Sequence, residues 1–130
     1  MHRAVLCCVS KISPPELDER RSSGDYYVLD IRPSESYRRE HIEGSHNVPV
    51  YGDLRRGDEG ELRRSLAELP DDRTVVTVCK AGIVARKATS VLEKEGYDAA
   101  TLAGGMRGWN GYQNGSVGYR LRSAIGRLLP

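Results

Sequence analysis

Cys79 is the residue in this sequence whose neighbours most favour nucleophilic chemistry. It follows a β-branched run, Val75 to Val78, that is typical of a strand buried on both faces, and an apolar helical pattern begins shortly after it at Val84. The turn between strand and helix places unpaired backbone N–H groups and the positive end of a helix dipole around the sulfur, and Lys80 and Arg86 add whole charges. Such a field favours the thiolate, which is the nucleophilic form of cysteine.

Gly82 is the second signal in this turn. Glycine adopts left-handed backbone angles at little cost, so it lets the chain fold tightly around the sulfur of Cys79. The alternative is that Cys79 is a strand cysteine that packs as a small hydrophobic residue. The position in the chain favours the first interpretation, but position alone does not decide between them.

Motifs in four places resemble the rhodanese family of single-domain sulfurtransferases, in the family's order and spacing, over about residues 9 to 111. They are Asp30-Ile31-Arg32, His41-Ile42-Glu43-Gly44, Cys79 with Gly82, and Gly104-Gly105 followed by Gly108-Trp109. Strands also alternate with helices along the whole chain, which by itself predicts a mostly parallel sheet covered on both faces. The resemblance implies an α/β fold, the rhodanese-like three-layer sandwich with a five-stranded central sheet.

The resemblance also assigns the site. It implies that Cys79 is the catalytic residue and that Arg32 contacts an anionic donor; the alternative for Asp30 and Arg32 is an ion pair that only secures their turn. The two histidines His41 and His46 are expected to be structural rather than metal ligands. The substrate- and anion-binding loop comprises Lys80, Ala81, Gly82, Ile83, Val84 and Arg86.

The implied reaction carries sulfane sulfur as a persulfide on Cys79. The donor would be thiosulfate or an organic persulfide, and the acceptor cyanide, a cellular thiol or a sulfur-carrier protein; no metal or organic cofactor is needed. Ile83, Val84 and Ala85 stand where many small family members have polar residues. So apolar a loop favours an organic or protein-bound persulfide over thiosulfate.

Two other functions compete with this one. A non-catalytic rhodanese-like module that binds a partner or senses redox state fits the apolar loop, although Cys79 and Gly82 argue against it. A cysteine phosphatase or arsenate reductase needs an arginine six residues after the cysteine, to hold an oxyanion with two hydrogen bonds. That position is Ala85, and Arg86 lies one residue too late.

Bulk properties exclude several classes. The 130 residues suffice for one domain, predicted at residues 1–112, with a tail at 113–130 that is either a docked or frayed end or an amphipathic helix for a membrane surface or partner. A formal net charge of +2 gives no argument for nucleic acid, and no apolar run is long enough to span a bilayer. Three cysteines, an odd number, fit a reducing, cytoplasmic location better than a disulfide framework.

Cys7 and Cys8 are expected to be residues of a first strand over residues 4–9.

The remaining elements follow from local patterns. Ser13-Pro14-Pro15-Glu16 predicts a helix start, and Ser34 opens a second short helix after a strand over residues 26–31. A short third strand follows His41. The charged segment Gly52 to Gly60 is expected to be a loop, residues 61–69 a helix, and residues 97–102 the last strand.

Overall fold

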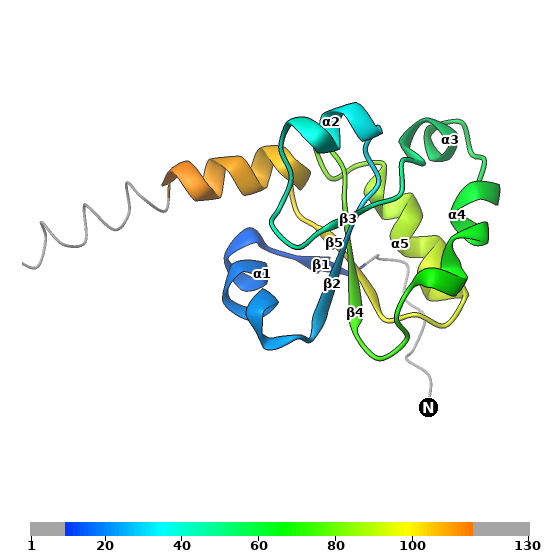
Figure 1. The fold of residues 1–130 in the computed structure, drawn as a ribbon, viewed down its shortest axis with the longest axis horizontal. Coiled ribbons are helices and arrows are strands. Elements are labelled where there is room, and N and C mark those ends of the chain that lie inside the picture. Colours follow the sequence, from blue (N-terminus) through cyan, green and yellow to red (C-terminus); the bar gives the residue numbers. More distant parts are fainter. Residues whose placement is uncertain (1–9, 116–130) are drawn as a thin grey trace, which may run out of the picture.

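The computed structural model of the chain describes residues 10–115, which form one parallel sheet with helices on both sides (Figure 1). The strand order is β1-β5-β4-β2-β3, and every neighbouring pair is parallel. The predicted five-stranded α/β fold is therefore confirmed. The strands are β1 (Lys11–Ile12), β2 (Tyr26–Asp30), β3 (His46–Asn47), β4 (Thr74–Val78) and β5 (Ala99–Leu102).

The central strand β4 is apolar on both faces because helices cover both faces of the sheet. Val75 packs into one hydrophobic cluster with Leu54 and Leu92, and its neighbour Val76 packs into a second cluster with Trp109. Successive strand side chains point to opposite faces, so a continuous β-branched run fills both cores. In register, Val76 pairs with Val28 of β2 and Ala100 of β5.

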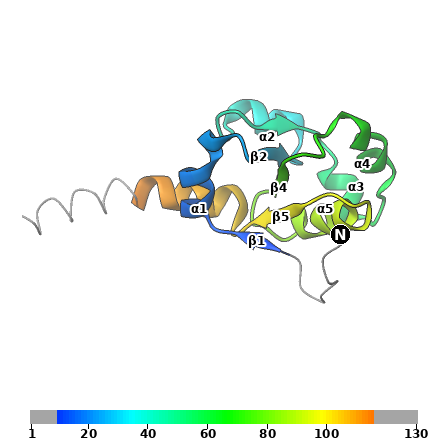
Figure 2. The same ribbon diagram turned by 90° about the horizontal axis from the view of Figure 1, so that it is seen from below.

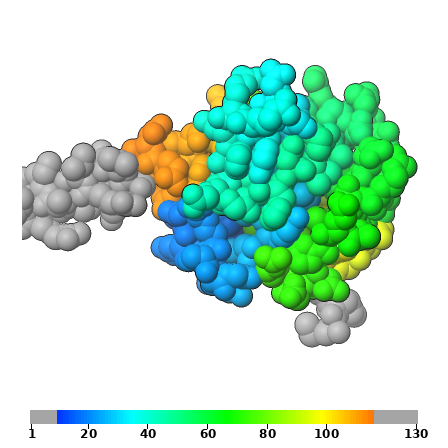
Figure 3. All heavy atoms as spheres, in the orientation of Figure 1, coloured from blue at the N-terminus to red at the C-terminus, as the bar shows by residue number. Residues whose placement is uncertain are grey.

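The helices divide between these two clusters. Helix α1 and the helical residues 105–115 lie on one side of the sheet, and α3, α4 and α5 lie on the other (Figures 1 and 2). The space-filling view shows the segment around α2, in cyan and teal, covering the face between α1 and α3–α4 (Figure 3). The labelled helices are α1 (Pro14–Arg20), η1 (Arg21–Ser23), α2 (Ser34–Arg39), α3 (Tyr51–Arg55), α4 (Gly60–Arg64), η2 (Leu66–Glu68) and α5 (Ala85–Lys94).

Two predicted helix boundaries are confirmed by their caps. At the start of α1, the Ser13 hydroxyl accepts a hydrogen bond from the Glu16 N–H at 3.3 Å, with proline in the first turn. At the end of α5, Gly96 has φ +92° and the next residue, Tyr97, donates its N–H to the Leu92 carbonyl at 2.9 Å. Both ends are fixed by local chemistry that the sequence displays.

The prediction of a loop from Gly52 to Gly60 is wrong in its first half. Tyr51–Arg55 forms α3, because Leu54 is buried in the core at 1% exposure and anchors the turn there. The predicted helix over residues 61–69 is also broken, into α4 and η2. Leu69 is extended because the following Pro70 disfavours helical angles at the residue before it.

The last strand is shorter than predicted. The last strand begins at Ala99 rather than Tyr97, since Tyr97 is used in the turn that closes α5. The predicted first strand over residues 4–9, with Cys7 and Cys8, lies outside the described residues, as does most of the predicted tail at 113–130. The first strand among the described residues is β1, immediately before Ser13. Within residues 10–115 no helix is long and apolar enough to cross a membrane.

Candidate active site

The sulfur of Cys79 accepts two backbone hydrogen bonds at the carboxyl end of β4. The Gly82 N–H donates to Sγ at 3.1 Å and the Ala85 N–H at 3.4 Å. Ala85 is the first residue of α5, so the sulfur also lies at the positive end of that helix dipole. The turn therefore directs donors at one atom, as expected from the sequence. The Cys79 residue is only 1% exposed.

Two glycine turns pack backbone against backbone beside this sulfur. Gly82 has φ +84°, and a Cβ there would lie 3.0 Å from the Gly104 nitrogen. Gly105 has φ +58°, and a Cβ there would lie 2.3 Å from the Cys79 carbonyl oxygen. Both positions need glycine for backbone angle and for space. The glycine-rich segment after β5 is thus a wall of the Cys79 turn.

The helical residues 105–115 are joined to the same turn by hydrogen bonds. The Met106 N–H donates to the Cys79 carbonyl at 2.8 Å, and the Arg107 N–H donates to the Lys80 carbonyl at 2.9 Å. The free N–H groups at the start of this helix thereby find acceptors in the turn after β4. Arg107 and Lys80 are held next to each other as a result.

Three buried threonines support the turn from inside the sheet. Thr77 Oγ1 lies 2.7 Å from Thr89 Oγ1, which lies 2.8 Å from Thr101 Oγ1, and all three residues are at most 2% exposed. Thr77 Oγ1 also donates to the Ala85 carbonyl at 3.1 Å. One arrangement uses each hydroxyl proton once: Thr101 donates to Thr89, Thr89 to Thr77, and Thr77 to Ala85. The chain of hydroxyls joins β5, α5 and β4 to the residue whose N–H meets the sulfur.

Arg32 forms a buried ion pair with Asp30 and also faces a cavity. Its Nε lies 3.0 Å from Asp30 Oδ1 and its Nη2 2.8 Å from Asp30 Oδ2, and Nη2 donates to the Glu40 carbonyl at 2.7 Å. Arg32 is 7% exposed and Asp30 1%. The interpretation that this pair secures the turn is therefore supported. No described residue accepts a hydrogen bond from Nη1 of Arg32.

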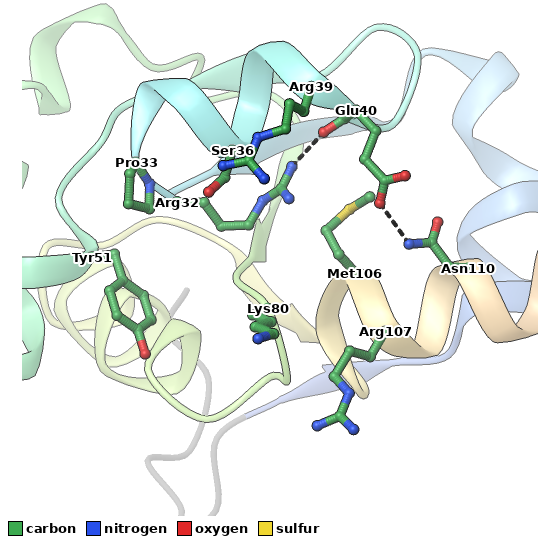
Figure 4. A pocket seen from close by; sticks show the side chains of 10 residues that line it. All are labelled: Arg32, Pro33, Ser36, Arg39, Glu40, Tyr51, Lys80, Met106, Arg107 and Asn110. Atoms are coloured by element: carbon green, nitrogen blue, oxygen red, sulfur yellow. Dashed lines mark hydrogen bonds between the residues drawn. The ribbon is translucent and has the colours of Figure 1, made fainter.

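A cavity of about 700 Å³ lies at this edge of the sheet, beside the Cys79 turn. Parallel strands bring the segments that follow β2, β4 and β5 to one edge, which is where ligands gather in open α/β sheets. Figure 4 shows side chains from these segments around the cavity. The lining residues are Arg32, Pro33, Ser36, Arg39, Glu40, Tyr51, Lys80, Met106, Arg107 and Asn110.

Only part of the predicted site lines this cavity. Lys80 and Arg32 do, whereas neither Cys79, which is buried, nor Arg86, which is exposed on α5, lines it. Ile83 is 64% exposed, the exposed large hydrophobic residue among those described, while Val84 is buried at 9%. Ala81 and Gly82 are half-buried in the turn.

Two basic residues that line the cavity, Arg39 and Arg107, were not predicted from the sequence. Arg39 ends α2, and Arg107 lies in the first turn of the helical residues 105–115, so both follow strands that end at the Cys79 edge. Their positions after β2 and β5 in a parallel sheet were the available signal.

The two histidines have structural contacts. His41 Nδ1 lies 2.7 Å from the Tyr37 carbonyl oxygen, and its ring stacks on Tyr37 with centroids 3.9 Å apart. His46 stacks on Tyr27 with centroids 4.3 Å apart. These contacts account for both side chains without chemistry.

Comparisons with known proteins agree with this geometry. A family model described as rhodanese-like domain matches residues 13–112. The HTH-type transcriptional regulator Rv0324 of Mycobacterium tuberculosis is 33% identical over 100 residues, which cover 75% of this chain and 40% of that protein. The probable adenylyltransferase/sulfurtransferase MoeZ of the same species is 36% identical over 102 residues, covering 77% of this chain and 24% of that protein. The chain thus spans less than half the length of either relative.

A shorter relative is covered more fully. Thiosulfate sulfurtransferase PspE of Escherichia coli is 30% identical over 81 residues, which are 61% of this chain and 69% of that protein.

Solved structures share the fold. Reduced CoADR-RHD of Bacillus anthracis superposes with a TM-score of 0.66 at 27% identity, covering 78% of this chain and 16% of that one. Thiosulfate sulfurtransferase of Pseudomonas aeruginosa superposes with a TM-score of 0.67 at 24% identity, covering 82% of this chain and 19% of that one, a likeness of fold alone. With a family model that matches most of its length and a cysteine turn at the carboxyl edge of a parallel sheet, the chain belongs to the rhodanese-like family.

Proposed function

We propose that the protein is a sulfurtransferase that carries sulfane sulfur as a persulfide on Cys79. The observation that carries the proposal is the pair of N–H donors, from Gly82 and Ala85, aimed at Sγ. Preorganised donors of this kind stabilise negative charge on the atom they face, and they do so for a thiolate before transfer and after it. The relatives named as sulfurtransferases support the same conclusion.

The first step loads the enzyme. The Cys79 thiolate attacks the outer sulfur of thiosulfate or of an organic persulfide. A bond forms between Sγ and that sulfur, and the bond from that sulfur to sulfite or to the organic thiolate breaks, with its electron pair leaving on the departing group. Attack by a thiolate on a sulfur that carries a good leaving group needs little help from a general base.

The second step discharges the persulfide. Cyanide, a thiolate or a sulfur-carrier protein attacks the outer sulfur, and the bond to Sγ breaks with its electron pair returning to Cys79. No net oxidation or reduction takes place over the two steps, so no redox cofactor is required. Lys80 directly follows Cys79 in the sequence and lines the cavity. Its positive charge therefore suits it to attract an anionic donor.

The test is the mass of the intact protein after brief incubation with thiosulfate and, separately, with glutathione persulfide. The proposal predicts a gain of one sulfur atom that cyanide removes and that Cys79→Ser lacks. The better of the two donors shows what the apolar loop selects. No gain with either donor would overturn the proposal.

A second candidate is a rhodanese-like module that binds a partner or senses redox state. The observations in its favour are the 1% exposure of Cys79, which limits access of a donor to the sulfur, and the 64% exposure of Ile83 in the same loop, which suits contact with a partner. The same mass measurement distinguishes the two functions. A module without transferase activity gains no sulfur from either donor.

A further inference from the structure

The cavity beside the Cys79 turn is larger than an inorganic donor needs. Its volume is about 700 Å³, whereas a water molecule takes about 30 Å³ of the liquid and thiosulfate is no larger than a few waters. Cavities of this size are typical of sites for organic ligands. Cys79 itself does not line the cavity, but the next residue, Lys80, does, and most of the other lining residues belong to the segments that follow β2 and β5.

Three of the four basic side chains that line this cavity are available to a ligand. Arg32 is not among them, because Asp30 already balances its charge. Among residues 10–115, neither Lys80 nor Arg107 has a side-chain hydrogen bond or ion pair. Arg39 has only Glu35, at 3.6 Å, with both side chains about three-quarters exposed, and exposed pairs of this kind contribute little.

The carboxylate among the lining residues, that of Glu40, already has a hydrogen-bond partner. Glu40 Oε1 accepts a hydrogen bond from Asn110 Nδ2 at 2.7 Å. Because Glu40 is one charge against three available cations, the cavity attracts anions overall.

The three cations come from two sides of the cavity. Lys80 and Arg107 are joined through the Arg107 N–H and the Lys80 carbonyl, so Arg107 lies beside the turn that carries the sulfur. Arg39 comes from α2, across the cavity from Arg107 in Figure 4. Lys80 connects the cavity to the Cys79 turn, so a molecule that reaches the sulfur past Lys80 would have its remaining atoms in the cavity that Arg39 and Arg107 line.

We propose that the organic partner in sulfur transfer is a low-molecular-weight thiol with at least two anionic groups away from its sulfur, bound by Arg39 and Arg107. The inference rests on the proposed function and names the substrate class of the same site. In the transfer, the thiolate bonds to the outer sulfur of the Cys79 persulfide, and the bond from that sulfur to Sγ breaks. The anionic groups are carboxylates or phosphates, which the same arginines bind.

The experiment separates loading from transfer. The protein is loaded with sulfur from thiosulfate or inorganic polysulfide, freed of excess donor, and mixed with a thiol while the loss of the extra sulfur is followed by intact mass. Two matched pairs of thiols serve as acceptors: glutathione against its diethyl ester, and coenzyme A against pantetheine. Each pair shares one thiol arm and differs in carboxylates or in phosphates.

At low thiol concentration, we expect the charged member of at least one pair to discharge the persulfide about tenfold faster, as for a ligand attracted by two or more cations. The pair that responds identifies the anionic group. Arg39→Gln and Arg107→Gln should each reduce this preference by about two- to fivefold, the range of exposed ion pairs. Arg38→Gln is the matched control: Arg38 is exposed on the same helix as Arg39 but does not line the cavity, and the preference should be unchanged.

Equal rates within both pairs would overturn this inference, as would a preference that survives in the Arg39→Gln/Arg107→Gln double variant. Failure at the loading step is a different result, seen before any thiol is added. It would contradict the proposed function and, with it, the inference that rests on it.

Discussion

The turns that follow β2 and β4 lie side by side and begin alike, yet they use their polar groups differently. Asp30 and Val78 are partners in the parallel register, and the Ile31 N–H donates to the Val78 carbonyl at 2.9 Å. After β2, the buried carboxylate of Asp30 is satisfied by Arg32. After β4, two N–H groups converge on the sulfur of Cys79.

The difference shows that a turn between a strand and a helix can either stabilise the fold, as after β2, or prepare a side chain for a reaction, as after β4. An ion pair buried within a turn consumes its charges and fixes the chain. Donors aimed at a single atom instead favour negative charge on that atom. Changes in the first turn should therefore act on folding, whereas changes in the second should also act on sulfur transfer.

The largest effect on activity is expected from Cys79→Ser. Sulfur transfer should be abolished, because serine forms no persulfide, while the free energy of unfolding should fall by no more than about 2 kcal/mol, as for most single substitutions. Thiocyanate formation from thiosulfate and cyanide measures the first quantity, and urea unfolding the second. Residual turnover at the level of the unmodified protein would remove Cys79 from the mechanism.

The largest effect on stability is expected from Asp30→Asn. The change leaves the Arg32 guanidinium buried without its countercharge, and breaking a buried pair in this way costs about 3–5 kcal/mol. Urea unfolding measures the loss. Glu35→Gln is the matched control, since its pair with Arg39 is exposed, and it should change stability by less than about 1 kcal/mol. Equal losses in the two variants would contradict the structural role of the buried pair.

Gly82→Ala should affect both properties. Positive φ costs an alanine about 1–2 kcal/mol, and the added Cβ also lies 3.0 Å from the Gly104 nitrogen. Gly57→Ala is the control, because Gly57 has φ +87° but nothing within 4 Å of the added atom. We expect the Gly82 variant to be the less stable of the two and to load sulfur at least severalfold more slowly. Loading rates that match in both variants would show that the close packing of the glycine turns is unimportant for transfer.

The smallest effect is expected from Thr89→Val. Removal of the middle hydroxyl leaves those of Thr77 and Thr101 without their shared partner, at a cost of about 1–2 kcal/mol. Thr89→Ser keeps the hydroxyl and should recover most of that loss. Thermal or urea unfolding of the two variants makes the comparison, and a serine variant no more stable than the valine one would assign the loss to packing instead.

The sequence was sufficient for the parallel sheet and for the turn around Cys79, because strong local signals mark both. The β-branched run before Cys79, the cap at Ser13 and the glycine at Gly96 each act within a few residues of themselves. The sequence did not reveal α3, whose helical turn depends on the burial of Leu54 against distant parts of the chain.

Only some of the residues that line the cavity were predictable, again because the others depend on contacts between distant parts of the chain. Lys80 and Arg32 are close in sequence to recognised motifs, but Arg39 and Arg107 reach the cavity through the packing of α2 and of the helical residues 105–115. Arg86 is exposed on α5 and, like Cys79, does not line the cavity. Which residues of a helix face a cavity depends on tertiary packing that no local pattern encodes.

The most direct test of the account uses the Cys7→Ser/Cys8→Ser double variant, in which Cys79 is the sole thiol of the chain. The variant is incubated with thiosulfate or glutathione persulfide and separated from excess donor. Its intact mass is then measured, and the protein is treated with cyanide. The account predicts one added sulfur per chain and an equal amount of thiocyanate released. A double variant that takes up no sulfur, while the unchanged protein does, would contradict the assignment of the persulfide to Cys79.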